Sequence, residues 1–185
     1  YHPGLNYIAG LNYQFQEDYT NALESYGWAA HSLQFRSASY AYMSQIHLLK
    51  NNYTEALHYA DLALRSNALN FNALAFKYLS LIQLNRNEES LSTLDILSKN
   101  DPLNHFVAFE RYNLNLINLE EHQSYHRSEY PFQTYLELAL FYHSLGNKKK
   151  AMDVLNLSPK HSLITLHRAY LEKDKGLLSS IADSS

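Results

Sequence analysis

The sequence predicts an all-α protein in which helical hairpins stack into an α-α superhelix, or solenoid. Residues that favour strands are scarce, because valine occurs only at Val107 and Val154. The 185 residues include 5 Gly, 4 Pro and no Cys, which leaves no collagen-like segment, flexible linker or disulfide framework. The third observation is a 34-residue period in the first part of the chain, and such a period is typical of repeat architectures.

Positions 34 residues apart hold residues of the same kind. Small side chains stand at Ala22, Ala56 and Ser90, and aromatic side chains stand at Tyr19 and Tyr53. The period defines three regular units with no gap between them: residues 3–36, 37–70 and 71–104. Because one hairpin cannot bury its apolar face alone, we expect each unit to stack on its neighbours and to share a continuous core with them.

Each regular unit has the pattern of two amphipathic helices joined by a polar turn. In residues 37–70, an apolar face with helical spacing runs from Tyr40 to His47. Asn52 then interrupts the pattern and is a suitable N-cap for the second helix. Small side chains form the inner face of that helix and allow the two helices to approach closely: Ala56, Ala60 and Ala63.

After residue 104 the pattern becomes irregular. Asp101 and Pro102 have the order of an N-cap and a first-turn proline, so we expect one helix from about Pro102 to Leu119 and then a polar loop. We take residues 1–185 to be a single array. Its later part divides into an irregular helix and loop over 105–130, a degenerate repeat over 131–158, and a C-terminal helix or helices over 160–183.

These features together resemble the tetratricopeptide repeat (TPR). The closest match is residues 37–70, SASYAYMSQIHLLKNNYTEALHYADLALRSNALN. There Tyr40, Met43 and Ser44 stand at the usual Trp, Leu and Gly positions, and Ala56 and Ala63 stand at the two alanines. The later segments DPLNHFVAFERY and YPFQTYLELALFY are also similar to the TPR region of large, uncharacterised bacterial proteins associated with glycan use.

The TPR resemblance implies a right-handed superhelix whose concave side is lined by the first helix of each unit. Proteins of this kind usually hold an extended peptide or a helix of a partner protein in that groove. Ala38 and Ala41 fall on the groove side, and eight larger residues are the candidate partner-binding residues: Tyr7, Phe15, Tyr42, Gln45, Asn72, Phe76, Leu79 and Gln83. None of these is Lys or Arg, which argues against a partner with an acidic C-terminus.

Charge and hydropathy exclude several other classes. The formal net charge is -3, so a strongly basic nucleic-acid-binding protein is excluded. The run Lys148 to Lys150 is expected to be a solvated helix face. No apolar stretch approaches the ~20 residues that span a bilayer, so we expect no membrane insertion, and a cytoplasmic location is slightly favoured. The chain begins with Tyr1, and we therefore expect a processed form or a piece of a longer protein.

Residues with catalytic or ligating chemistry do not form a recognisable active-site motif, so we expect no enzyme activity, cofactor or metal in this chain. His122 and His126 are four residues apart with acidic neighbours, which leaves a metal-dependent hydrolase as a third hypothesis. Glu110 and Arg111 are expected to form a local ion pair or one between helices.

The first hypothesis for function is a non-catalytic protein–protein interaction scaffold that binds a peptide, a partner protein or another domain of the same chain in its concave groove. The second hypothesis follows from the glycan-associated resemblance. It is that the chain is an accessory TPR module of a larger bacterial carbohydrate-acting enzyme.

Overall fold

The structure is a computed structural model that describes residues 2–126 and 130–173. Within these ranges the chain forms eleven α-helices and no β-strand, which confirms the all-α prediction. The chain divides into two compact units, Tyr1–Pro102 and Leu103–Ser185. In the described ranges, no helix combines the length and the apolar character that crossing a membrane requires.

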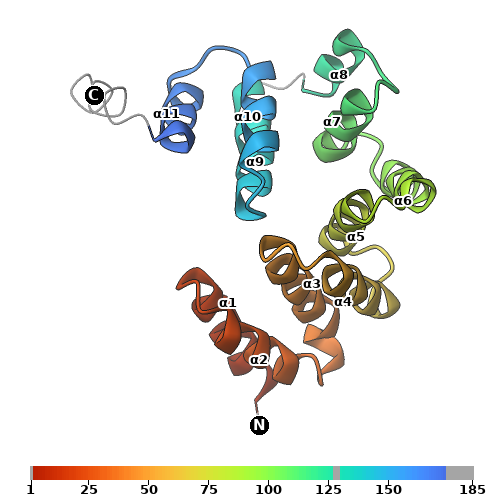
Figure 1. Ribbon diagram of the computed structural model, residues 1–185, viewed down its shortest axis with the longest axis vertical. Helices are drawn as coiled ribbons and strands as arrows, with labels where there is room; N and C mark the ends of the chain where they lie inside the picture. Colours follow the sequence, from red (N-terminus) through yellow and green to blue (C-terminus); the bar gives the residue numbers. More distant parts are fainter. Residues whose placement is uncertain (1, 127–129, 174–185) are drawn as a thin grey trace. The chain divides into compact units, whose positions relative to one another are not determined.

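The first unit consists of three helical hairpins (Figure 1). Their helices are α1 (Pro3–Phe15) and α2 (Tyr19–Ala29), α3 (Leu33–Leu49) and α4 (Tyr53–Ser66), and α5 (Phe71–Gln83) and α6 (Asn87–Asn100). Each helix packs against the next one along the chain. The first helices of neighbouring hairpins also touch, α1 against α3 and α3 against α5. This stacking of hairpin on hairpin is how a solenoid builds its core.

The turn inside each hairpin repeats one backbone conformation. The φ angle is 61° at Glu17, 58° at Asn51 and 57° at Asn85, so all three residues occupy the left-handed region. Asparagine enters this region more readily than most residues, which suits two of the three turns. The turns have the same 34-residue spacing as the side-chain pattern. Asn52 stands at the N-cap of α4, as its position in the sequence indicates.

Small residues let the two helices of a hairpin approach closely. Ala56, on the inner face of α4, is fully buried as predicted, and the buried hydroxyl of Ser44 donates a 2.7 Å hydrogen bond to its carbonyl oxygen. In the first hairpin, Gly10 faces the ring of Tyr26. A Cβ atom added at Gly10 would lie only 2.6 Å from Cε1 of that ring. The small positions therefore set the distance between paired helices.

The second unit contains shorter and less regular helices. They are α7 (His105–Asn113), α8 (Leu119–Tyr125), α9 (Pro131–Ser144), α10 (Lys148–Leu157) and α11 (Ser162–Glu172). α9 and α10 form a hairpin whose turn contains Gly146 at φ 72°. α11 falls in the expected C-terminal helical segment, and residues 174–183 of that segment lie outside the described residues.

The single helix expected from Pro102 to Leu119 is wrong at both ends. α7 begins only after Asn104, because Oδ1 of Asn104 accepts hydrogen bonds from the backbone N–H groups of Phe106 and Val107 at 3.0 and 3.4 Å. α7 then ends at Asn113, and Asn115 takes a φ of 55°. Asn side chains and the left-handed turn thus set both ends of the helix.

The loop expected after Leu119 is also wrong for residues 120–125, which belong to α8 (Leu119–Tyr125). Oδ1 of Asn118 caps this helix by accepting a 2.8 Å hydrogen bond from the N–H group of Glu121. The sequence contains the signal, an Asn followed three residues later by a Glu. α8 is short, and the fully buried His122 lies on it.

A buried carboxylate links three helices of the second unit. Glu110 of α7, only 2% exposed, accepts hydrogen bonds from the Tyr142 hydroxyl of α9 and the Lys150 ammonium of α10. The expected ion pair with Arg111 is therefore wrong, and Lys150 is not part of a solvated face. The true partner is 40 residues further along the chain, where sequence proximity gives no indication of it.

Candidate functional site

The first helices of the three hairpins surround a small cavity. Its volume is about 130 Å³, and it lies among side chains of α1, α3 and α5. Five of the eight candidate partner-binding residues line it: Tyr7, Tyr42, Gln45, Asn72 and Phe76. The other lining residues are Ala38, Ala41 and Asn70. We call this cavity the concave pocket.

The helical repeat brings these residues together. On α3, the lining residues Ala38, Ala41, Tyr42 and Gln45 have the spacing i, i+3, i+4 and i+7, which places them on one face. Because α3 contacts both α1 and α5, this face lies between the flanking first helices. Two alanines in the middle of the face leave the room that the cavity occupies.

One wall of the pocket is a cluster of aromatic rings. The ring of Tyr42 stacks on that of Tyr26 with centroids 5.2 Å apart, and Tyr7 meets Tyr42 edge to face at 6.0 Å. Burial raises the pKa of Tyr7 to about 12, with a further contribution from Tyr42. Burial likewise raises the pKa of Tyr26. The hydroxyls of Tyr7 and Tyr26 therefore stay neutral at physiological pH and can act as hydrogen-bond donors and acceptors.

A short chain of hydrogen bonds positions Gln45. The Tyr26 hydroxyl donates to Oε1 of Gln14 at 2.9 Å, and Nε2 of Gln14 donates to Oε1 of Gln45 at 3.1 Å. This fixed amide sits beside two aromatic rings in a lining that contains no Lys, Arg, Asp or Glu. The concave pocket therefore suits an uncharged group that can both pack and form hydrogen bonds.

The two asparagines of the pocket have different roles. Oδ1 of Asn70 caps α5 by accepting from the N–H group of Ala73 at 3.1 Å, and its Nδ2 donates to the Ser37 hydroxyl at 2.9 Å. Asn72 is exposed, and its side chain forms no hydrogen bond with any described residue. Sequence reasoning missed Asn70, although its position just before an apolar helix is typical of an N-cap.

The other three candidate residues do not line the pocket. Phe15 is 88% exposed and Leu79 is 8% exposed, while Gln83 is exposed at the end of α5. Phe15 is eight residues after Tyr7, which turns it about 80° around the helix. Leu79 is part of the core.

The two histidines of the metal hypothesis lie in a stack of rings. His126 stacks on Tyr135 at 4.0 Å and on His105 at 4.6 Å, and the His122 ring lies 4.7 Å from it. Nδ1 of His126 is 2.7 Å from the Thr134 hydroxyl. Within residues 2–126 and 130–173, no three His, Cys, Asp or Glu side chains are placed to hold a metal ion.

Burial also keeps the histidine stack uncharged. Burial lowers the pKa of His122, and the neighbouring His105 lowers it further. Burial, together with His122 and His105, lowers the pKa of His126 to about 3. Both rings are therefore neutral at physiological pH, and the geometry is that of an aromatic packing cluster.

Comparison with known proteins identifies the fold. No family profile matches the sequence, and no curated protein is significantly similar to it. A tetratricopeptide repeat protein from Parabacteroides merdae is similar in structure, with a TM-score of 0.57 and 14% identity over 98% of this chain and 91% of that chain. The MamA protein is similar with a TM-score of 0.54 and 8% identity, covering 94% of this chain and 95% of its own. The chain therefore has the tetratricopeptide-repeat fold that its sequence resembles.

Proposed function

We propose that the protein is a non-catalytic scaffold that binds an extended, uncharged segment of a partner protein, or of a neighbouring domain, in the concave pocket. The observation that carries the proposal is the meeting of Tyr7, Tyr42, Gln45, Asn72 and Phe76 around one cavity on the first helices. The fold supports it, since proteins built from stacked hairpins present extended binding surfaces.

The size and lining of the pocket define the segment it would accept. A cavity of ~150 Å³ holds a benzene-sized group, so 130 Å³ accommodates one apolar side chain of the partner. In this proposal, the amides of Gln45 and Asn72, which both line the pocket, hydrogen-bond the backbone on either side of that anchor. A charged anchor would lose its hydration without gaining an opposite charge, which is costly.

Mutations that only shorten the pocket residues test this proposal poorly. The double variant Tyr42→Ala, Phe76→Ala is an obvious choice, but Phe76 is 3% exposed and Tyr42 stacks on a buried ring. Their loss would destabilise the core as well as the pocket. Filling the cavity is the cleaner change, and Ala38→Leu places new methyl groups into it.

The experiment uses an array of peptides of about twelve residues. Each peptide carries Leu, Phe, Glu or no anchor in a Ser/Asn background. We expect binding only with Leu or Phe, and we expect Ala38→Leu to reduce it at least tenfold while Thr54→Leu, an exposed control on α4, has no effect. Equal peptide binding by Ala38→Leu and Thr54→Leu, or a preference for the peptide with the Glu anchor, would refute the proposal.

A further inference from the structure

The helix α1 carries apolar residues on two faces. One face carries Tyr7 and Gly10 and packs on the Tyr26 ring. The other carries four exposed side chains: Leu5 at 63%, Ile8 at 62%, Leu11 at 36% and Phe15 at 88%. No residue from Pro3 to Phe15 is Lys, Arg, Asp or Glu. Large apolar side chains that are exposed together mark a contact surface, so this outer face of α1 is a candidate.

A second cavity lies on the other side of the same unit. It has a volume of about 450 Å³ and is bounded by α4, α5 and α6. On α5, its lining residues Leu74 and Lys77 lie on the side opposite Asn72 and Phe76 of the concave pocket, as 100° per residue requires. We call this cavity the outer groove.

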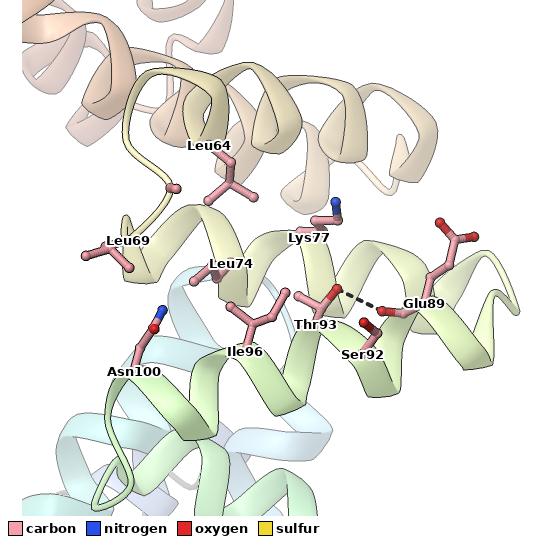
Figure 2. Close-up of a pocket in the computed structure, with 10 residues that line it drawn as sticks. Leu64, Leu69, Leu74, Lys77, Glu89, Ser92, Thr93, Ile96 and Asn100 are labelled. Atoms are coloured by element: carbon pink, nitrogen blue, oxygen red, sulfur yellow. Dashed lines mark hydrogen bonds between the residues drawn. The ribbon is translucent and has the colours of Figure 1, made fainter.

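The outer groove has an apolar end and a polar end (Figure 2). Leu64, Leu69, Leu74 and Ile96 gather at one end, and Lys77 and Glu89 lie toward the other. α6 contributes one stripe of residues from Glu89 to Asn100, which spans ~16 Å at 1.5 Å per residue. Leu69 is 70% exposed and Ile96 is 44% exposed, so leucine-sized surface is open to a partner.

The charges at the outer groove are already paired within the chain. Lys77 forms a 2.7 Å ion pair with Asp61, and Glu89 forms one of 2.6 Å with Arg86. A neutral partner therefore leaves no charge of the groove buried without its counter-ion. A charged partner would compete with the ion pairs that already form within the chain. The paired charges and apolar end of the groove therefore favour an uncharged, apolar helix, and its length corresponds to about three helical turns.

We propose that the outer groove binds the outer face of α1 from a second copy of the chain. The stripe from Leu5 to Phe15 is ~15 Å long, which matches the groove, and α1 is uncharged, as the groove requires. Within one molecule this face does not meet the groove, because α1 packs on α2 and α3 while the groove lies among α4, α5 and α6. The contact therefore forms between molecules.

The proposed contact is heterologous, because a helix of one copy enters the groove of the next. Such contacts build open complexes with one free helix and one free groove at the ends, unless the ends meet and close a ring. If a fully exposed large side chain has an area of ~200 Å², the exposed fractions of the four side chains together give roughly 500 Å² of accessible surface. An interface of about 1,000 Å² in total is at the low end of specific interfaces, so association is weak and depends on concentration.

Two single variants test the proposal by analytical ultracentrifugation across a concentration series. Phe15→Glu puts a charge on the helix face, and Ile96→Glu puts one in the groove. We expect the wild-type average mass to rise with concentration to that of two chains or more. Each variant alone should stay at one chain. An equimolar mixture should reach two chains and stop, because it retains one intact helix and one intact groove that can meet.

The controls separate this contact from other causes of association. Thr54→Glu, exposed and outside both surfaces, should associate like the wild type, and circular dichroism checks that each variant folds. If Ile96→Glu fails to fold, Leu69→Glu replaces it. A wild type that remains monomeric, a groove variant that still associates, or a mixture that stays at one chain would overturn the proposal.

Discussion

The close approach of α1 and α2 predicts opposite effects for the same substitution at two glycines. At Gly10, a new methyl group would lie 2.6 Å from the ring of Tyr26. That ring cannot move aside, because it is fully buried, stacks on Tyr42 at 5.2 Å and is hydrogen-bonded to Gln14. At Gly27 of α2, an added Cβ atom meets no other atom within 4 Å.

The magnitudes follow from two competing terms. Overpacking costs ~1–3 kcal/mol, while replacing Gly by Ala inside a helix gains ~0.5–1 kcal/mol. We therefore expect Gly10→Ala to lower the free energy of unfolding by about 1–2 kcal/mol and Gly27→Ala to raise it by up to about 1 kcal/mol. Urea unfolding followed by circular dichroism measures both, with an unchanged m-value as the test of comparable unfolding. A stabilised Gly10→Ala variant would refute the predicted close packing.

Three further predictions concern the buried polar groups. Lys150→Ala leaves Glu110 buried without its cation and should destabilise the second unit by about 3–5 kcal/mol. The double variant Glu110→Leu, Lys150→Leu removes both charges and should recover most of that loss. Urea unfolding measures the stability of both variants, and equal losses would contradict this account. Acid should destabilise the same unit, because His126 has its pKa lowered to about 3 while an unfolded histidine titrates near 6.5. As the pH falls, the unfolded chain therefore binds a proton at this histidine before the folded chain does. The stability contribution is complete above pH 6.5 and decreases by about 2 kcal/mol by pH 5. His126→Gln should flatten the dependence of unfolding free energy on pH, and a variant with the same pH dependence as the wild type would contradict this. Tyr26→Phe removes the hydroxyl that hydrogen-bonds Gln14, so we expect a stability loss of about 1 kcal/mol and weaker peptide binding. Peptide binding equal to that of the wild type would show that the hydrogen-bond chain does not position the Gln45 amide.

The regular part of the fold was predictable because its signal repeats. Ala22, Ala56 and Ser90 mark the period in the sequence, and the left-handed residues Asn51 and Asn85 mark it in the backbone. Repetition makes each assignment support the others. No such support exists beyond residue 104, where the ends of α7 depend on single polar residues.

The candidate site was predictable only where helical register alone determines position. Tyr42 and Gln45 share one face of α3 and both reach the concave pocket. Phe15 lies outside this pocket because the register turns it to the outer face of α1, and Leu79 lies outside it because neighbouring packing buries it. Lys150 and Glu110 meet through tertiary structure across 40 residues, which no local pattern reveals.

Hydrogen exchange with and without a bound peptide tests the concave pocket most directly. The probe is the neutral peptide with a Leu or Phe anchor that binds best. We predict slower exchange confined to the pocket-lining stretches of α1, α3 and α5, with α4, α6 and the second unit unchanged. Protection that appears instead around the outer groove or in the second unit, or no protection at all under saturating peptide, would contradict the assignment of the concave pocket as the binding site.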